Sequence, residues 1–488
     1  MTTTTTTENN KLEEKRTSDN EPFSIYSSSQ KVAIAALVSM AGLLSPLTGN
    51  IYFPALNSVE KELHTTTELV NLTITLYMVF QGVSPAFWGA FADAWGRRPI
   101  YLTTLAVYLG TCIGCALAPN YPALLVLRML QAFGSSSVIA IGAGVISDIA
   151  LPSERGRLSS LVASGQILGP CIGPIIGGVL SEAVSWRWTF WFLVIYGGIV
   201  YLCLLFLLPE TLRILVGNGS GYANPTPLQW IRRRRLGITE KTTTISTQRK
   251  RPNPLRPFIY LLQPDIAVML VFYGIIYANM YALMVTIPNQ FGVVYGLNEL
   301  QMGLCYLPLG AGCVLGAAFN GYLMDRHFRV ESRNYGCEPK MGRLPIDFPV
   351  FRCRLRTTWI NIIFIDIIAI VYGWLLQQHV HLAAPLVLQF VYGISIMGVN
   401  NTFQTLMIDL YPGKGASITA SNNFVRCLLG AIATVVIDPG INGVGVGWMF
   451  TILGLIMTAA NVMLVVLRIY GPRWRKARMQ KQDQSLKH

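Results

Sequence analysis

Twelve apolar runs, each long enough to form a membrane-spanning helix, constrain the fold of this chain more than any other feature. A helix needs about 20 apolar residues to cross the hydrocarbon core of a bilayer, where its backbone groups must be hydrogen-bonded within the chain. Hydrophobic residues make up 52% of the 488 residues and charged residues only 13%, which excludes a water-soluble domain. The sequence therefore predicts an all-α membrane protein with twelve transmembrane helices. The expected spans are 32–53, 69–89, 99–118, 123–148, 158–180, 188–209, 266–290, 299–322, 357–376, 383–407, 415–436 and 447–469.

A short turn with several charged residues follows the second apolar run, and its spacing recurs after the eighth run. Such charges are costly inside the hydrocarbon core, so each turn is expected at a membrane surface. The repeat predicts two six-helix halves related by pseudo-symmetry. The residues of the two turns are Gly89, Asp93, Gly96, Arg97, Arg98, Gly321, Asp325 and Arg326.

A polar segment between the sixth and seventh runs separates the two halves. It contains NGSGYANPTP and the consecutive arginines 232–235, a composition typical of a linker. The N-terminus begins MTTTTTTENNKLEEKR, a polar, low-complexity sequence that predicts disorder. The expected parts are a disordered tail at 1–30, an N-terminal half at 31–209, a basic linker at 210–257, a C-terminal half at 258–470 and a basic tail at 471–488.

The lysines and arginines outside the apolar runs lie almost entirely on one side of the predicted topology. Lys61 and Arg187 are the two that lie on the other side. The positive-inside rule therefore predicts that both termini and the linker are cytoplasmic. The formal net charge of +14 also suits nucleic acid, but the basic clusters flank membrane spans. Attraction to the anionic inner leaflet is the simpler interpretation, and no nucleic-acid partner is expected.

Arg128 and Arg426 lie inside the fourth and eleventh runs. An arginine at the centre of a membrane helix costs roughly 2.5 to 3.5 kcal/mol on insertion scales, which favours a functional role. In one interpretation, each guanidinium faces a water-filled cavity and acts there. In the other, amides such as Gln131, Asn422 and Asn423 hold it, and it braces the bundle.

The fifth run contains GQILGPCIGPIIGGVL, in which glycines recur every four residues and so share one face of a helix. Such a face lets a neighbouring backbone approach closely, and Pro170 and Pro174 permit a bend. The face is interpreted either as a pivot between two conformations or as plain tight packing.

These residues carry a resemblance to a known family. The turn at 89–98 resembles the signature loop of the major facilitator superfamily, and Arg128 resembles the arginine of its fourth-helix motif. Segments such as SPLTGNIYFPAL, LLPETLR and IDPGINGVGVGW resemble fungal twelve-spanning drug:proton antiporters, notably the quinidine-resistance group. The similarity covers about residues 30–470, with the departure that Ala94 stands where the family loop often has a basic residue. The residues similar to the fifth-helix antiporter motif are Gly169, Gly173, Pro174, Gly177 and Gly178.

The resemblance implies two six-helix halves around a central cavity that opens alternately to the two sides of the membrane. It also implies that Asp93, Arg97 and Arg98 lock one state near the inner face. Asp148 and Arg155 are close enough in the topology to join this charge network, and an ion pair formed in one state alone would bias that state.

Polar and aromatic residues on the spans that surround the centre in this family are the expected substrate-binding residues. Each could equally form a hydrogen bond between helices. A cavity of aromatic and amide side chains suits amphipathic organic substrates. These residues are Asn50, Tyr77, Gln81, Gln166, Tyr277, Tyr281, Asn400, Asn401 and Gln404.

The resemblance further implies coupling to protons, with Arg128 in the relay. Asp366 is the only acidic residue expected deep in a span, and it is interpreted either as a contact between helices or as a proton carrier. The leading hypothesis is a proton-coupled antiporter that exports drugs and other amphipathic small molecules by alternating access. The alternative is a dedicated exporter of one metabolite, such as an organic acid or a secondary metabolite, because Arg128 and Arg426 would attract an anion.

Neither an enzyme, a cofactor nor a metal site is expected, because the runs lack the arrangement of His and acidic residues that such chemistry needs. The family similarity implies a monomer in the plasma membrane, with the vacuolar membrane as the alternative.

Overall fold

The computed structural model describes residues 24–236, 252–334, 348–411 and 415–485, and within these ranges some side chains, including those of Arg155 and Asp325, are not described. The described residues form helices and no strand, and twelve helical segments are long and apolar enough to cross a membrane. The predicted all-α membrane fold with twelve spans is confirmed.

The first six spans and two short helices precede the gap at 237–251. Their elements are α2 (Ser28–Asn50), η1 (Phe53–Ala55), α3 (Leu56–Glu62), α4 (Thr67–Trp95), α5 (Arg97–Ala116), α6 (Tyr121–Ser135), α7 (Ser137–Ile149), α8 (Pro152–Ala183), α9 (Arg187–Leu207), α10 (Arg213–Val216) and α11 (Pro227–Arg235).

The last six spans follow that gap. Their elements are η2 (Arg256–Leu262), α12 (Pro264–Thr286), η3 (Ile287–Phe291), α13 (Gly292–Tyr295), α14 (Glu299–Leu304), α15 (Leu307–Asn334), α16 (Val350–Arg354), α17 (Thr358–Gln377), α18 (Ala383–Leu410), α19 (Gly415–Val444), α20 (Val446–Ala460) and α21 (Val462–Ser485).

Polar residues and glycines mark where helices begin and end. The side chain of Asn120 accepts a hydrogen bond from the backbone N–H of Ala123 (3.0 Å) and caps the start of α6. Gly96 ends α4 with a φ of +115°, a conformation that side chains rarely adopt, and α5 begins at the next residue. A Cβ at Gly96 would also collide with the side chains of Glu210 and Asn224, so the charged turn after the second span requires glycine.

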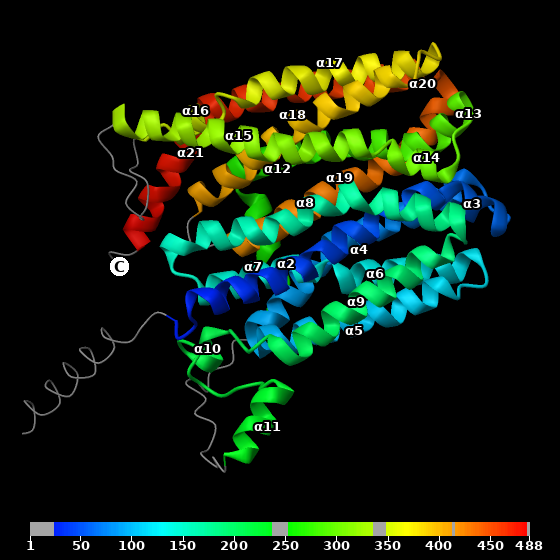
Figure 1. The fold of residues 1–488 in the computed structure, drawn as a ribbon. Coiled ribbons are helices and arrows are strands. Elements are labelled where there is room, and N and C mark those ends of the chain that lie inside the picture. Colours follow the sequence, from blue (N-terminus) through cyan, green and yellow to red (C-terminus); the bar gives the residue numbers. More distant parts are fainter. Residues whose placement is uncertain (1–23, 237–251, 335–347, 412–414, 486–488) are drawn as a thin grey trace, which may run out of the picture.

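The two halves lie side by side along the length of the bundle (Figure 1). Within the halves, α2 packs against α8 and α15 packs against α18. Between the halves, α4 packs against α19 and α8 packs against α14. Helices α10 and α11 lie outside the bundle at the end where α2 begins and α21 ends (Figure 1). We call this end the termini end and the other the opposite end.

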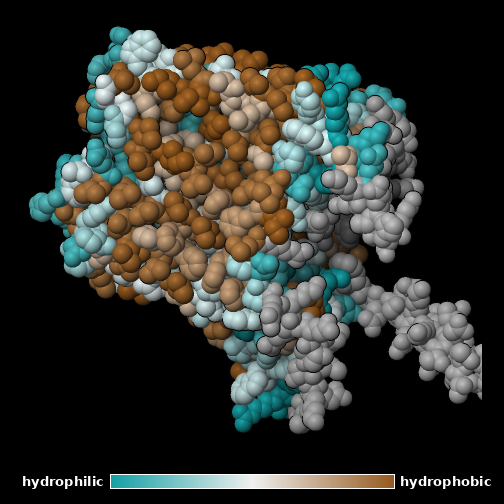
Figure 2. Space-filling model, turned by 180° about the vertical axis from the view of Figure 1, so that it is seen from behind, coloured by the Kyte–Doolittle hydropathy of each residue, from teal (hydrophilic) through white to brown (hydrophobic). Residues whose placement is uncertain are grey.

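A belt of apolar side chains surrounds the bundle. Figure 2 shows hydrophobic residues over the middle of one face and hydrophilic residues towards both ends. On α9, Ile195, Ile199 and Leu202 follow one another at helical spacing and are 57%, 51% and 53% exposed. So large an apolar surface is stable only in an apolar environment. The chain is therefore a multi-pass membrane protein.

Several helices continue beyond the expected spans, α15 and α19 among them. Helix α15 reaches Asn334 rather than 322, and α19 reaches Val444 rather than 436. An apolar run ends where polar residues begin, whereas a helix ends where its backbone hydrogen bonds stop. As a result, Asp438 lies inside α19 and is only 7% exposed.

Candidate functional site

A cavity of about 410 Å³ lies between the two halves. Its lining residues come from α2, α4, α7 and α8 of the N-terminal half and from α12, α15, α18 and α19 of the C-terminal half. Several of them, including Ser159, Gln404 and Thr419, lie in the parts of their helices that are nearest the termini end. The cavity therefore extends from the middle of the bundle towards the termini end.

All but one of the residues expected to bind substrate line this cavity. Tyr77 is the exception: its ring lies against the Arg128 guanidinium, 4.4 Å from ring centroid to Cζ, and it is 2% exposed. Tyr77 lies instead on the side of α4 that faces the neighbouring helix α6, a rotation that helical spacing alone does not predict. The residues that do line the cavity are Asn50, Gln81, Gln166, Tyr277, Tyr281, Asn400, Asn401 and Gln404.

Several of these side chains also bond to neighbouring groups, as the alternative interpretation expected. Asn400 accepts a hydrogen bond from the Tyr273 hydroxyl (2.7 Å), and Asn401 donates one to the Ala317 carbonyl (3.2 Å). Asn50 donates to the Pro46 carbonyl (2.6 Å) within its own helix. The cavity wall is therefore partly fixed by its own hydrogen bonds.

Arg426 is the only charged side chain among the described residues that line the cavity. One of its terminal nitrogens donates a hydrogen bond to the Asn423 side chain (2.8 Å), and its guanidinium lies 4.5 Å from the centroid of the Tyr277 ring. Its Nε has no hydrogen-bond partner among the described residues. Among its described lining residues, the cavity therefore presents a positive charge and no carboxylate.

Arg128 has different surroundings. It is fully buried between the rings of Tyr52 and Tyr77, each 4.4 Å from its Cζ, and it donates a hydrogen bond to Gln131 (2.9 Å). Arg128 is not one of the described residues that line the cavity. This arrangement matches the brace interpretation for Arg128, whereas Arg426 matches the cavity interpretation.

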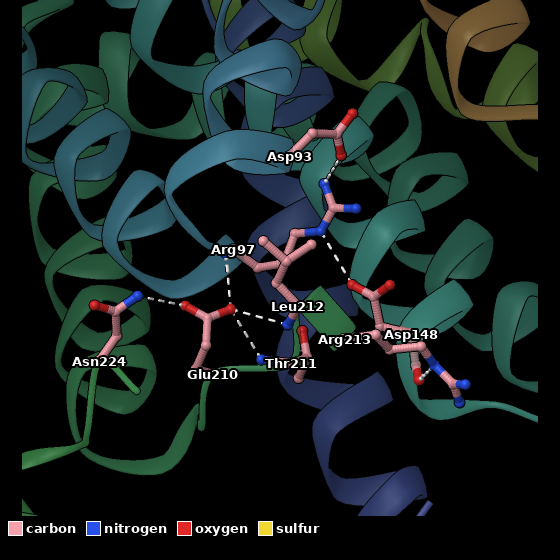
Figure 3. A network of polar contacts seen from close by, with 8 residues as sticks. All are labelled: Asp93, Arg97, Asp148, Glu210, Thr211, Leu212, Arg213 and Asn224. Carbon is pink, nitrogen blue, oxygen red and sulfur yellow. Dashed lines mark hydrogen bonds and ion pairs between the residues drawn. The ribbon is translucent and has the colours of Figure 1, made fainter. Parts of the chain in front are cut away.

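A charge network at the termini end joins the turn at 93–97 to the end of the fourth span (Figure 3). Arg97 forms ion pairs with Asp93 (2.6 Å) and with Asp148 (3.1 Å). The side chain of Asp148 is 13% exposed and that of Asp93 is 67% exposed. Asp148 therefore belongs to the network, as expected from its place in the topology.

Glu210, in the sequence LLPETLR, ties the same turn to the chain after the sixth span (Figure 3). One of its carboxylate oxygens accepts hydrogen bonds from the backbone N–H groups of Arg97 (2.9 Å), Thr211 (3.0 Å) and Leu212 (3.0 Å). The other accepts one from the Asn224 side chain (3.0 Å). No role was predicted for this carboxylate, although it lies within LLPETLR, one of the segments that carry the family resemblance.

The other charged residues expected at the two turns are placed differently. Arg98 makes no ion pair with a described residue and instead donates hydrogen bonds to the backbone carbonyls of Leu205 (2.8 Å) and Asn224 (3.3 Å). Arg326 is exposed and makes no ion pair with any described residue. The side chains of Arg155 and Asp325 lie outside the described part of the chain. Gly89 and Gly321 have open space where a Cβ would be.

The C-terminal half contains a counterpart of the Arg97–Asp148 pair that no sequence pattern had indicated. Arg354, on α16, pairs with Asp409 at the end of the tenth span, with distances of 2.9 and 3.0 Å. Burial raises the pKa of the Asp409 carboxyl, although the Arg354 guanidinium acts in the opposite direction. The segment between α15 and α16 separates Arg354 from the repeated turn, so spacing did not reveal the pair. The sequence did contain one signal for this pair: Asp409 lies at the end of the tenth run, as Asp148 lies at the end of the fourth.

At the opposite end, polar contacts join the two halves. The Asp438 carboxylate accepts hydrogen bonds from Asn71 of the N-terminal half and from Asn289 of the C-terminal half. Ser58 donates a hydrogen bond to Glu299, and the backbone N–H of Glu299 donates to Glu182 (3.1 Å). These contacts close the opposite end of the bundle.

The glycines of α8 lie against the backbones of two other helices. A Cβ at Gly169 would be 2.7 Å from the Cβ of Pro46, and one at Gly177 would collide with the Ile51 carbonyl. Gly178 faces the other half, where its added Cβ would be 3.2 Å from the Cα of Gly303. The carbonyl of Pro174 faces the same Gly303, and Gly173 lies against Asn50. Tight packing is thus observed, and the pivot role stays a prediction.

Asp366 joins helices and does not line the cavity. It accepts hydrogen bonds from Asn461 (2.6 Å) and Thr458 (3.4 Å), which lie at the junction of α20 and α21. This geometry matches the interpretation as a contact between helices.

Two six-helix halves that enclose a central cavity and meet at one end define a membrane transporter. The family model of the Major Facilitator Superfamily matches residues 38–434. The chain belongs to the major facilitator superfamily.

Fungal transporters are similar over almost the whole chain. Citrate exporter 1 of Aspergillus niger is 38% identical over 477 residues, which cover 95% of this chain and 90% of that protein. Multidrug transporter QDR2 of Candida glabrata is 31% identical over 491 residues, which cover 95% of this chain and 84% of that protein. The predicted resemblance to fungal drug transporters is confirmed, and these names indicate a transporter rather than an enzyme.

A solved structure shares the fold. The human organic anion transporter MFSD10 has a TM-score of 0.56 at 15% identity, covering 89% of this chain and 99% of that one.

Proposed function

We propose that this protein is a secondary active exporter of organic anions, carboxylic acids in particular, that works by alternating access. The observation that carries this proposal is the charge of the cavity: Arg426 is its only charged residue among the described lining residues. A cationic drug in this cavity would have no carboxylate to pair with among the described lining residues. A carboxylate substrate would instead pair with the Arg426 guanidinium, which lies in surroundings of low dielectric constant.

The surroundings of Arg426 suit a carboxylate ligand. Its contacts with Asn423 and Tyr277 fix the guanidinium, and its buried Nε has no hydrogen-bond partner among the described residues. Guanidinium N–H groups form a planar fork that matches the two oxygens of a carboxylate. The similarity to a protein named as a citrate exporter supports the same substrate class.

Efflux from yeast cells that express the chain tests this proposal. Cells preloaded with labelled citrate or benzoate are compared for the parent, Arg426→Gln, Arg426→Lys and the control Arg232→Gln, which removes an exposed charge on α11. With surface expression matched, Arg426→Gln is expected to reduce acid efflux at least about tenfold, and the control less than twofold. Arg426→Lys should retain only part of the activity. Unchanged acid efflux in Arg426→Gln would contradict the proposal.

Multidrug export is the second candidate, and the apolar part of the cavity favours it. Tyr273, Tyr281, Met280, Met284 and Met397 line the cavity, and flexible Met-rich surfaces adapt to varied ligands. The similarity to proteins named as multidrug transporters supports this candidate. A panel of cationic drugs in the same assay separates the two: drug efflux that does not depend on Arg426, without acid efflux, would favour the multidrug exporter.

We further propose that export is coupled to protons and that the chain acts as a monomer in the plasma membrane, or alternatively in the vacuolar membrane. The termini end would face the cytoplasm, which makes this structure an inward-facing state. The family resemblance and the distribution of basic residues support these statements. We expect a protonophore to abolish efflux. We also expect a protease to reach a C-terminal tag only after the plasma membrane has been permeabilised.

A further inference from the structure

A second pocket, of about 320 Å³, lies at the termini end of the C-terminal half and is separate from the central cavity. It is formed where the end of α15, helix α16, the start of α17 and helix α21 meet. The lining residues used below are His327, Glu331, Arg352, Arg356, Trp359 and Arg468.

The pocket carries a net positive charge. Arg352, Arg356 and Arg468 line it, and none of the three makes an ion pair or hydrogen bond with a described residue. Glu331 is the one carboxylate among the described lining residues, and it pairs with none of these arginines. Three arginines that line one pocket and have no partner among the described residues form a site for an anion.

The local fold turns these arginines towards the pocket. Arg352 and Arg356 are four residues apart and both exposed, whereas Arg354 between them is 6% exposed and pairs with Asp409. The buried Arg354 also lies 4.2 Å from the centroid of the Phe328 ring. Arg354 therefore anchors the segment, and this anchor holds Arg352 and Arg356 on the opposite side.

His327 supplies a further polar group. Its Nδ1 is buried in the pocket wall and has no hydrogen-bond partner among the described residues. Because this nitrogen is buried, an oxygen of a ligand reaches it only after the imidazole ring rotates, and in the right tautomer it then donates a hydrogen bond.

The pocket borders the apolar belt of the bundle. Beyond Arg356, α17 exposes Ile360 (61%), Ile363 (56%) and Ile367 (54%) along one face, at helical spacing. Ile469, next to Arg468 on α21, is 53% exposed. Trp359 stands at the boundary, the position that tryptophan prefers at a membrane interface. A ligand whose charged group fills the pocket would thus have an apolar surface beside it for hydrocarbon chains.

We propose that this pocket binds the phosphate-bearing headgroup of an anionic membrane lipid. Arg352, Arg356 and Arg468 contact the phosphate oxygens, His327 donates a further hydrogen bond, and the acyl chains lie along the isoleucines of α17. Glu331 limits the net charge of the pocket and repels an anion placed on its side. Basic pockets between membrane helices are suited to such headgroups. This site is independent of the transported substrate.

Binding to the full-length protein, purified in an uncharged detergent, tests the proposal. The probes are dioctanoyl phosphatidylinositol 4-phosphate, dioctanoyl phosphatidylcholine and the free headgroup inositol 1,4-bisphosphate, with affinity measured by microscale thermophoresis. The pocket variant combines Arg352→Gln, Arg356→Gln and Arg468→Gln. The control variant combines Arg232→Gln, Arg234→Gln and Arg235→Gln, an equal loss of charge on α11. Size-exclusion chromatography and thermal unfolding check that both are folded.

The phosphoinositide is expected to bind the parent, to bind the pocket variant at least about tenfold more weakly and to bind the control variant within about twofold of the parent. If the triple variant does not fold, the single variant Arg468→Gln should still weaken binding about threefold or more. Equal losses in both triple variants would overturn the proposal in favour of general attraction to basic charge. Equal binding of phosphatidylcholine would exclude headgroup recognition. Binding of inositol 1,4-bisphosphate as tight as that of the lipid would overturn the lipid assignment and indicate a soluble phosphorylated ligand.

Discussion

Individual residues with the same chemistry occupy different surroundings in this transporter. Arg128 is enclosed by Tyr52 and Tyr77 within the N-terminal half, whereas Arg426 reaches the cavity. The fully buried Arg128 is shielded from a ligand, whereas Arg426 lines the cavity. We therefore propose different roles for the two arginines, which look alike in the sequence: Arg128 braces the bundle and Arg426 binds the substrate.

Replacement of Arg128 by Gln is expected to lower the free energy of unfolding by about 2 kcal/mol or more. The change removes a cation from between two aromatic rings and leaves the Gln131 side chain without its donor. Thermal unfolding of the purified protein measures the effect, and Arg128→Lys, which keeps the charge, should fall between the parent and Arg128→Gln. A normal melting temperature together with lost efflux would contradict the brace and favour the relay.

In the charge network, Asp148→Asn is expected to reduce stability more than Asp93→Asn. Asp148 pairs with Arg97 in a largely buried position, where loss of one partner costs about 3 kcal/mol. Asp93 is 67% exposed, and an exposed pair contributes about 0 to 1 kcal/mol. Thermal unfolding of the two variants at matched detergent and salt compares them. Efflux measured alongside tests the gating role, since unchanged transport in both variants would exclude it.

At the scale of the helix, α8 links the two halves through its glycines. Gly169 and Gly177 let it approach α2, and Gly178 lets it approach α14 of the other half. Because the neighbouring atoms belong to the backbone or, at Gly169, also to the rigid ring of Pro46, they cannot rotate away from an added side chain as a flexible side chain would. The packing of these three helices therefore depends on the absence of Cβ atoms at these positions.

Gly177→Ala is expected to destabilise the protein by about 1 to 3 kcal/mol, because its methyl group would collide with the Ile51 carbonyl. Gly156→Ala, in the same helix, is the control: its Cβ would meet no atom within 4 Å, so the melting temperature should stay the same or rise. The two melting temperatures provide the comparison. If both changes shifted the melting temperature equally, helix propensity rather than packing would explain the effect.

The whole molecule is closed at one end by contacts that cross between the halves. Asp438 connects Asn71 with Asn289, while Glu299 connects Ser58 with the end of α8 through Glu182. Such contacts stabilise the state in which they exist relative to a state in which the halves separate there. The equilibrium between the closed and the open state of this end is therefore a property of the entire bundle rather than of one helix.

Asp438→Ala is expected to shift this equilibrium towards opening of the opposite end, because Asn71 and Asn289 lose their common acceptor. Thr75, which is hydrogen-bonded to Thr434 across the halves at 2.8 Å, reports the opening when replaced by Cys. Labelling of this cysteine by a membrane-impermeant maleimide should be at least about threefold faster with Asp438→Ala than with Asp438 present. Equal labelling rates would show that Asp438 does not hold the closed state.

Much of the fold follows from the sequence. The twelve spans are set by apolar length, since only helices of that length satisfy their backbone groups in a bilayer. The turn at 93–97 and the glycine face of α8 were also found, because local spacing determines which residues share a turn or a helix face. Most of the residues expected to bind substrate do line the cavity, since polar side chains in membrane helices face the interior.

Tertiary packing decided the rest. It turned Tyr77 towards Arg128 and left Arg426 alone at the cavity, because the rotation of each helix depends on its neighbours. It also paired Arg354 with Asp409 and brought Asp438 between Asn71 and Asn289, contacts between residues far apart in the chain. The sequence by itself determined which segments are in the membrane, because that depends on composition and length. Only the three-dimensional arrangement decided which charges meet, because that depends on distances between helices that no local pattern contains.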